Sequence, residues 1–252
     1  MKMTHVPFAA LVAAVLMLAF LAPAADPAPQ SPDKIRLLVV TGGHGFEKEP
    51  FFKLFKDNPD VTCQAAEHPN AHALLKAEAA KQWDVLVLYD MHQDITAEAK
   101  TDFVARLKEG KGLVVLHHAI ADYQDWPEYT TIIGAHYYLA ATNINGVAKP
   151  RSAWKEGMHY RLHIADTNHP VMRGLSDFDT HDETYKWFDV AKEVHPLLTT
   201  DEPESNKIIG WAKNYEQARV FYMQSGHDHF AYENPNFQQI LRQAIRWTAH
   251  RD

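Results

Sequence analysis

The chain has 252 residues, of which 46% are apolar and 23% charged, and it carries a formal net charge of −7. These fractions are those of a folded globular protein and exclude a largely disordered or collagen-like chain. A single cysteine excludes an internal disulfide framework and a zinc site built from several cysteines. The negative charge argues against nucleic acid or an anionic membrane as the main partner. The unusual feature is the set of 16 histidines, because imidazole binds metals and transfers protons near neutral pH.

The first 24 residues have the pattern of a cleaved export signal. Lys2 precedes an apolar run from Phe8 to Ala22, and a further small residue follows at Ala24. A run of about 15 residues falls short of the roughly 20 that a membrane-spanning helix needs. We therefore expect this segment to be cleaved rather than kept as an anchor, and we do not expect an integral membrane protein. The prediction is a signal peptide over residues 1–24, a Pro-rich disordered segment over residues 25–34, and a mature protein in the periplasm or outside the cell.

After the signal, apolar runs of strand length alternate with helical patterns. Strands are expected at residues 35–41, 60–64, 83–89 and 112–116, and helices at residues 47–56, 71–80 and 96–109. This alternation is typical of an open parallel sheet with right-handed crossovers. Cys63 lies in the second of these strands, and we expect it to pack in the core rather than to react as a thiol.

The second half of the chain has a different pattern. Residues 140–189 are polar, and we expect loops there with one edge or antiparallel strand at residues 158–164. Two further strands are expected at residues 208–212 and 219–224, followed by an amphipathic closing helix over residues 236–249. Because no internal repeat or linker interrupts the pattern, residues 35–252 are predicted to form one α/β domain.

Histidines and carboxylates collect where the predicted strands end. His44 follows the first strand, Asp90 and His92 the third, His117 and His118 the fourth, and His227 and His229 the last. In open α/β sheets, ligands bind outside the carboxyl ends of the strands. We therefore expect these side chains to share one site, although a single strand-end histidine is more often a satisfied hydrogen-bonding residue.

These residue types suit two kinds of chemistry. Histidines and carboxylates ligate Zn²⁺ or a similar divalent ion, which polarises a carbonyl or acidifies a bound water. Without a metal, the same groups can form an acid–base pair. The predicted metal ligands are His44, His117 and His227. The predicted catalytic residues are His117, Glu183, Asp90 and His227, and the predicted substrate-binding residues are His118, Trp126, Tyr185 and His229.

Several of these residues also have a purely structural interpretation. A solvated turn would explain the two acids and the ring of residues 181–185 equally well. The aromatic rings of Trp126, Trp154, Tyr185 and Trp187 can stack on sugars, but such residues more often pack in a core or a lid.

Other chemistries fit the sequence less well. The glycines at positions 42, 43 and 45 do not form the G-x-G-x-x-G loop of a dinucleotide site, so we expect no nucleotide cofactor. The G-x-S-x-G elbow of α/β-hydrolases is missing from the sequence. Ser225 lies beside His227, but no oxyanion-hole glycine pattern is near it.

Seven short motifs together resemble one known family. They are residues 41–44 (TGGH), 112–119 (GLVVLHHA), 125–129 (DWPEY), 169–170 (HP), 182–185 (DETY), 226–229 (GHDH) and 232–235 (YENP). In combination they resemble the ThuA-like, or trehalose-utilisation, proteins from about residue 35 to residue 247. The resemblance implies a fold similar to class I glutamine amidotransferases, a flavodoxin-like three-layer sandwich with a mostly parallel central sheet.

The resemblance also implies a changed site chemistry. In amidotransferases a cysteine follows a central strand and a late His-Pro-Glu completes the triad. Here His117 takes the place of that cysteine, and the late motif reads His227-Asp228-His229, so no glutamine hydrolysis is expected. The residues that match the recurring polar positions of the family are His44, His117, Glu183 and His227.

Two functions are compatible with these observations. The family is associated with disaccharides and their 3-keto derivatives, so the first hypothesis is an exported hydrolase, lyase or isomerase that acts on such a sugar. The second is a non-catalytic carbohydrate-binding or accessory protein with the same pocket. The sequence does not identify the bond acted on or the metal. It is compatible with a homo-oligomer but does not fix the oligomeric state. No role is predicted for His68, His72, His159, His163, His195 and His250.

Overall fold

A nine-stranded sheet runs through the computed structural model, which describes residues 34–252. Residues 1–33 lie outside the described part, and with them the predicted signal peptide and all of the Pro-rich segment except Lys34. The described residues form one compact unit. None of their helices is both long enough and apolar enough to cross a membrane.

The sheet has a parallel half and an antiparallel half. The parallel half contains, in spatial order, β2 (Val61–Glu67), β1 (Ile35–Gly42), β3 (Val85–Asp90), β4 (Gly112–Leu116) and β13 (Ala218–Met223). The antiparallel half continues with β12 (Ile208–Tyr215), β11 (His195–Thr199), β8 (Ala153–Ile164) and β9 (Phe178–Lys186). Because β2 and β3 lie on opposite sides of β1, the topological switch point falls between β1 and β3.

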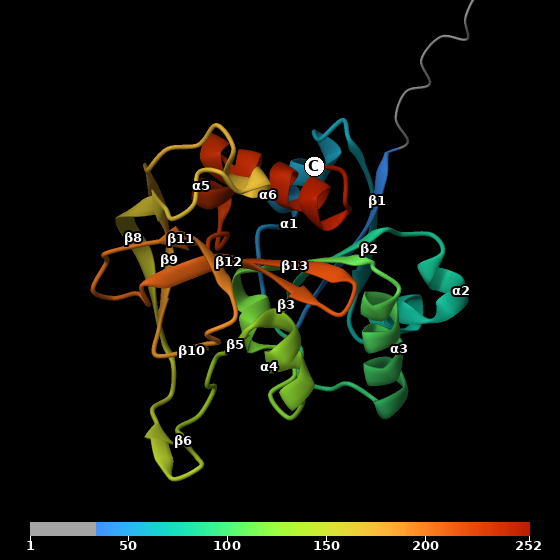
Figure 1. Cartoon of the computed structure of the whole chain (residues 1–252), viewed down its shortest axis with the longest axis horizontal. Coiled ribbons are helices and arrows are strands. Elements are labelled where there is room, and N and C mark those ends of the chain that lie inside the picture. Colours follow the sequence, from blue (N-terminus) through green and yellow to red (C-terminus); the bar gives the residue numbers. More distant parts are fainter. Residues whose placement is uncertain (1–33) are drawn as a thin grey trace, which may run out of the picture. The chain divides into compact units, whose positions relative to one another are not determined.

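Helices cover both faces of this sheet, as Figure 1 shows. One layer consists of α1 (Lys48–Lys56), η3 (Pro170–Met172), α5 (His229–Tyr232) and α6 (Pro235–Thr248). The other consists of η1 (Asn70–Leu75), α2 (Ala77–Ala80), α3 (Ala97–Lys108), η2 (His117–Ala121) and α4 (Pro127–Ile133). Two short strand pairs complete the fold: β5 (Ala135–His136) with β10 (Asp189–Val190), and β6 (Thr142–Ile144) with β7 (Val147–Lys149). The predicted three-layer α/β sandwich is confirmed.

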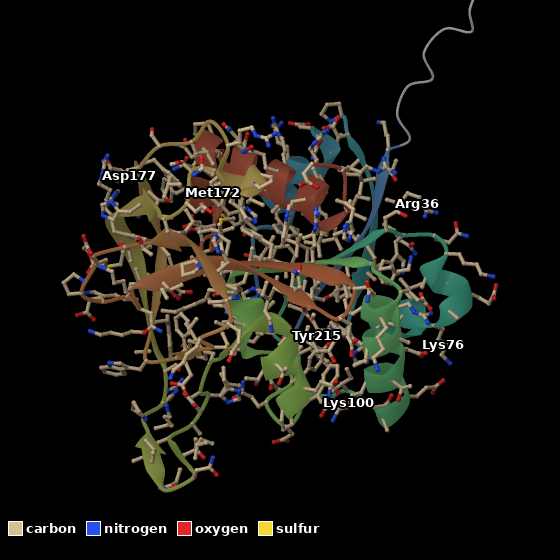
Figure 2. All side chains as sticks on the ribbon, in the orientation of Figure 1. Arg36, Lys76, Lys100, Met172, Asp177 and Tyr215 are labelled. Atoms are coloured by element: carbon tan, nitrogen blue, oxygen red, sulfur yellow. The ribbon has the colours of Figure 1, made fainter. Side chains whose placement is uncertain are left out.

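The central strands are apolar throughout because they are buried on both faces. Alternate residues of β1 enter different cores: Leu37 and Val39 pack under α1 and α6, whereas Leu38 and Val40 pack under η1 and α3. Side chains fill the space on both sides of the sheet, with Met172 in the α6 layer and Tyr215 beside α4 (Figure 2). Each fully buried Leu or Val side chain contributes about 1.5–3 kcal/mol relative to its exposed state. These two cores hold the strand ends, and hence the site, in place.

Two expectations about secondary structure are wrong in part. Residues 71–80 do not form one helix, because Lys76 is extended between η1 and α2, with ψ at 146°. The segment of residues 140–189 is not mainly loop, because β8 and β9 form a long antiparallel pair there. Their half-exposed, polar residues hide the strand pattern, and the pairing joins residues that are distant in sequence.

The expected burial of Cys63 is also wrong. Cys63 is exposed, together with its neighbours Thr62 and Gln64. The reason is the place of β2 at the edge of the sheet, where only Val61 is fully buried.

Candidate functional site

His117 occupies a strained turn directly after β4. It has a φ of 53°, a left-handed conformation that residues other than glycine seldom adopt and that occurs preferentially at functional sites. Its side chain is fully buried. Nδ1 donates a hydrogen bond to the backbone carbonyl oxygen of Gln224 at 2.7 Å, which fixes the ring and directs Nε2 into the site.

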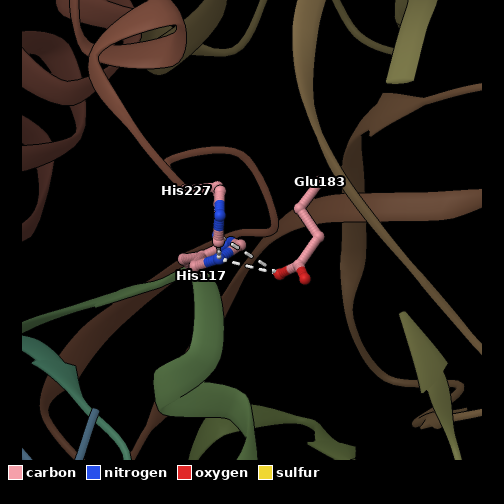
Figure 3. A group of neighbouring side chains, drawn as sticks. All are labelled: His117, Glu183 and His227. Carbon is pink, nitrogen blue, oxygen red and sulfur yellow. Dashed lines mark hydrogen bonds and ion pairs between the residues drawn. The ribbon is translucent and has the colours of Figure 1, made fainter. Parts of the chain in front are cut away.

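A carboxylate and a second imidazole meet this nitrogen. Oε2 of Glu183, on β9, lies 3.1 Å from Nε2 of His117 and 3.5 Å from Nδ1 of His227. The two ring nitrogens are 3.3 Å apart. Figure 3 shows the three side chains converging from separate parts of the chain. We call His117, Glu183 and His227 the His–Glu–His group.

Two buried neighbours hold this group in place. The Tyr185 hydroxyl lies 2.8 Å from Nε2 of His117. Asp182 accepts hydrogen bonds from the backbone N–H groups of Gly226 at 2.9 Å, His227 at 3.0 Å and Glu183 at 2.8 Å. Burial raises the pKa of Asp182, although the charge of His117 and these three donors oppose the rise. One carboxyl group thus ties β9 to the loop that carries His227.

Electrostatics within the group favour a cation between its members. Burial by itself would lower the pKa of His117, but the hydrogen bond and charge of Glu183 outweigh it and raise that pKa. Burial opposes ionisation of Glu183 as well, yet the hydrogen bond to His117 and the charges of both histidines lower the pKa of Glu183. Three lone-pair atoms this close repel one another unless a proton or a metal ion lies among them.

The spacing of these atoms fits a divalent metal. Ligand atoms about 2.0–2.1 Å from a tetrahedral zinc ion lie about 3.3 Å from one another, and the three distances here are 3.1, 3.3 and 3.5 Å. No other cluster of three or more such ligand atoms was found among residues 34–252. Two imidazoles and one carboxylate are also a donor set that leaves coordination positions open for water or substrate.

A cavity of ≈ 260 Å³ opens beside the group. Glu183 and Tyr185 form part of its wall, and His44 and His118 form another part. Nδ1 of His118 donates to the backbone carbonyl oxygen of Asp90 at 3.0 Å, while Nε2 has no partner among the described residues. Burial lowers the pKa of His118 well below its usual value, so the ring is neutral and its buried Nε2 is an acceptor that none of the described residues uses. A larger hollow of ≈ 860 Å³ beside β5 and β10 contains no member of the group.

Of the three predicted metal ligands, the structure brings together His117 and His227 but not His44. The His44 ring packs on His118, with ring centroids 4.6 Å apart, and the third ligand position is filled by Glu183. His44 follows Gly43, whose backbone passes so close to Met91 that a Cβ atom would lie 2.1 Å from the Met91 oxygen. This course of the chain places His44 on the cavity wall, outside the His–Glu–His group.

Asp90 lies in a second cluster of titratable residues. Its carboxylate is fully buried, and Oδ2 is 2.6 Å from Nε2 of His68. The His68 ring stacks on His92 at 4.2 Å and approaches His72 at 4.6 Å. Burial, together with the charge of Asp90, raises the pKa of neighbouring Asp122 well above its usual value. Because the Asp90 side chain does not line the cavity, this geometry gives no support to its predicted role in catalysis.

Two of the four predicted substrate-binding residues do not line the cavity. Trp126 is 6% exposed and packs edge-to-face on Phe103 at 5.5 Å, on the side of the sheet where Figure 2 labels Lys100. The backbone N–H and the ring Nδ1 of His229 both bond to Glu47, so this residue ties α5 to the start of α1. His118 and Tyr185 are the two that line the cavity.

A comparison with family models identifies the family of this chain. The model of the ThuA family, described as trehalose utilisation, matches residues 36–248. The chain belongs to the ThuA family. That description gives the family a carbohydrate-related role. A search among curated proteins finds no match to this chain.

Solved structures of ThuA-like proteins share the fold. One from Parabacteroides merdae is 19% identical, with a TM-score of 0.73, and the match covers 86% of this chain and 90% of that one. One from Bacteroides uniformis is 18% identical, with a TM-score of 0.67 and coverage of 89% and 95%. A glutamine amidotransferase from Thermotoga maritima is 11% identical, with a TM-score of 0.51 and coverage of 85% and 98%. The implied similarity to the amidotransferase fold is therefore confirmed.

Some residues of this candidate site received no role from the sequence. They are Asp182 behind the group, and Tyr137, Arg151 and Glu156 on the cavity wall. The sequence signal for Asp182 was weak, because its only mark is its place in the DETY motif beside Glu183. Arg151 and Glu156 flank the start of β8, a strand whose first half was not predicted.

Proposed function

We propose that this ThuA protein is an exported carbohydrate-processing enzyme, a hydrolase, lyase or isomerase that acts on a disaccharide or keto-sugar. The observation that carries the proposal is the convergence of two imidazole nitrogens and one carboxylate oxygen within 3.5 Å beside a cavity. The family description supports a sugar as substrate, and the pattern of residues 1–24 supports export. Glutamine hydrolysis is excluded from the proposal, because His117 follows β4 and the single cysteine, Cys63, lies on β2.

Each residue of the site has a defined part in this proposal. His117, Glu183 and His227 hold a divalent cation such as Zn²⁺. Such an ion, when bound, polarises a carbonyl oxygen or lowers the pKa of a coordinated water. Asp182 holds His227 and Glu183 in position through hydrogen bonds from their backbone N–H groups, and His118 packs beside His44 in the cavity wall. If the protein carries no metal, Glu183 and His117 are the acid–base pair of the same reaction.

The test combines metal content with turnover. The mature protein, purified without chelators, is examined by elemental analysis, and turnover of trehalose and 3-keto-trehalose is followed by chromatography. We expect about one equivalent of a divalent metal and a fall in turnover of about 100-fold or more in His117→Ala, with sugar affinity retained. His195→Ala is the matched control, because that exposed ring pairs with Asp166 outside the cavity.

The outcomes separate the two functions. A wild-type protein that binds the sugars without converting them is a carbohydrate-binding protein, and the enzymatic proposal then fails. Full turnover by His117→Ala would contradict the assigned role of the His–Glu–His group. A protein that converts the sugar without metal, but loses conversion in both His117→Ala and Glu183→Gln, works by acid–base chemistry alone.

A further inference from the structure

The wall of the cavity continues along β8 beyond the His–Glu–His group. In the antiparallel pairing of β8 and β9, Trp154 stands directly opposite Tyr185. Directly opposed residues project from the same face of a sheet, and so do residues two apart on one strand. Trp154, Tyr185 and Glu183 therefore share one face, and all three line the same cavity.

Trp154 is exposed in a setting that suits a ligand. Half of its surface is in contact with solvent, at 50% exposure. A single exposed apolar residue needs no explanation by itself, but this one stands at a cavity wall between two charged residues. The Arg151 guanidinium lies 5.1 Å from the centre of the indole ring, and Glu156 lines the same wall. Neither Arg151 nor Glu156 forms an ion pair with any of the described residues, so both can bind hydroxyl groups.

The size of the cavity limits what it can enclose. Its volume of ≈ 260 Å³ is below the roughly 300–1,000 Å³ of pockets that enclose drug-sized ligands. One sugar ring, rather than two, matches that space. A second ring attached to the first would extend outward, toward the exposed Trp154.

From these observations we propose that Trp154, Arg151 and Glu156 form a second sugar subsite at the mouth of the cavity. The first ring of a neutral disaccharide lies inside, next to Glu183 and His118, and the second ring stacks its apolar C–H face on the indole of Trp154. Arg151 and Glu156 bind the hydroxyls at its edge. One positive and one negative charge favour a neutral sugar over a sugar acid. This subsite rests on the proposed carbohydrate function.

Calorimetric binding tests the subsite without turnover. The ligands are four neutral disaccharides (trehalose, maltose, cellobiose and lactose), with glucose, galactose and glucuronate. We expect wild-type protein to bind at least one disaccharide more tightly than its component monosaccharides. Trp154→Ala should lower the affinity for that disaccharide by about tenfold and leave the affinity for monosaccharides within about twofold of wild type. Trp154→Phe should retain most of the disaccharide affinity.

Trp187 supplies the matched control. It is 53% exposed and lies two residues after Tyr185, but it does not line the cavity. Trp187→Ala should leave all affinities unchanged, and circular dichroism checks that each variant is folded. The subsite is wrong if no disaccharide binds more tightly than its monosaccharide, if Trp154→Ala keeps full disaccharide affinity, or if glucuronate binds best. Disaccharide binding that depends on Trp154 in a protein without turnover would support the subsite while refuting the enzyme.

Discussion

At the scale of single residues, His117 and His118 show how the backbone selects which ring nitrogen is available. Each imidazole bonds through Nδ1 to a carbonyl oxygen, that of Gln224 for His117 and that of Asp90 for His118. Each ring is buried, so neither can turn to exchange its nitrogens. Two adjacent residues therefore hold Nε2 in different settings, one beside a carboxylate and one buried without a partner among the described residues.

The Asp90 cluster gives a pH-dependent prediction at the same scale. Burial, together with the charges of His68 and His92, lowers the pKa of His72 from 6.5 to about 4. As pH falls from about 6.5 to 4, the unfolded chain takes up a proton at His72 that the folded protein does not. The free energy of unfolding should therefore fall over this interval by about 1 kcal/mol from this residue, because His72 is only partly buried and solvent screens its charge.

Urea unfolding at pH 7 and at about pH 4.5 checks this prediction. Carboxylates also titrate in this range, so the comparison is between variants. His72→Gln should lose less stability than wild type on acidification, whereas His250→Gln, at the exposed end of the chain, should behave as wild type. An equal loss in wild type and His72→Gln would show that His72 does not contribute.

At the scale of elements, the loop between β1 and α1 depends on one glycine. Gly43 has a φ of 75°, and a Cβ atom there would lie 2.1 Å from the Met91 carbonyl oxygen. The loop passes this close to the end of β3 because the switch point lies between β1 and β3. The tight approach places His44 on the cavity wall.

We expect Gly43→Ala to lower the free energy of unfolding by about 1–3 kcal/mol, because the loop must move away from Met91 and the new residue is strained. Sugar affinity should fall as well, since His44 moves with the loop. Gly45→Ala is the control: a Cβ atom at Gly45 meets nothing within 4 Å, so its stability should stay near that of wild type. Urea unfolding measures the stability of both variants. Equal stability of Gly43→Ala and Gly45→Ala would contradict the close approach of the loop to Met91.

At the scale of the whole molecule, the site joins the two halves of the sheet. His117 follows β4 of the parallel half, His227 follows β13 at the junction, and Glu183 belongs to β9 at the far antiparallel edge. A metal bound by all three would cross-link these parts in the folded state only. Its binding free energy would then add to the stability of the entire unit.

Thermal unfolding tests this coupling. Free Zn²⁺ at about 100 times its Kd should stabilise the protein by about 2.7 kcal/mol, which corresponds to a rise in Tm of about 5–10 °C for a chain of this size. A chelator should reverse the rise. The Tm of Glu183→Gln should change little on addition of Zn²⁺. If its Tm rises as much as that of wild type, the metal binds elsewhere.

Much of the fold and part of the site can be predicted from the sequence. The continuous apolar runs of β1, β3 and β4 identify buried parallel strands without knowledge of their partners, because burial on both faces leaves a local signal. The same local reasoning places His117, His118 and His227 at strand ends, and the motif that contains Glu183 points to the family. These features depend on residues that are close in sequence.

Only the tertiary structure decides which of these side chains meet. Glu183 rather than His44 completes the group, Asp90 turns to His68, and Trp154 faces Tyr185 across β8 and β9. Each of these contacts joins segments distant in sequence, and each depends on the path of a loop or on strand register. A shift of one residue in register would turn Trp154 to the other face of the sheet. The 16 histidines therefore indicate that a site exists, whereas long-range packing determines that two of them, with one glutamate, form its centre.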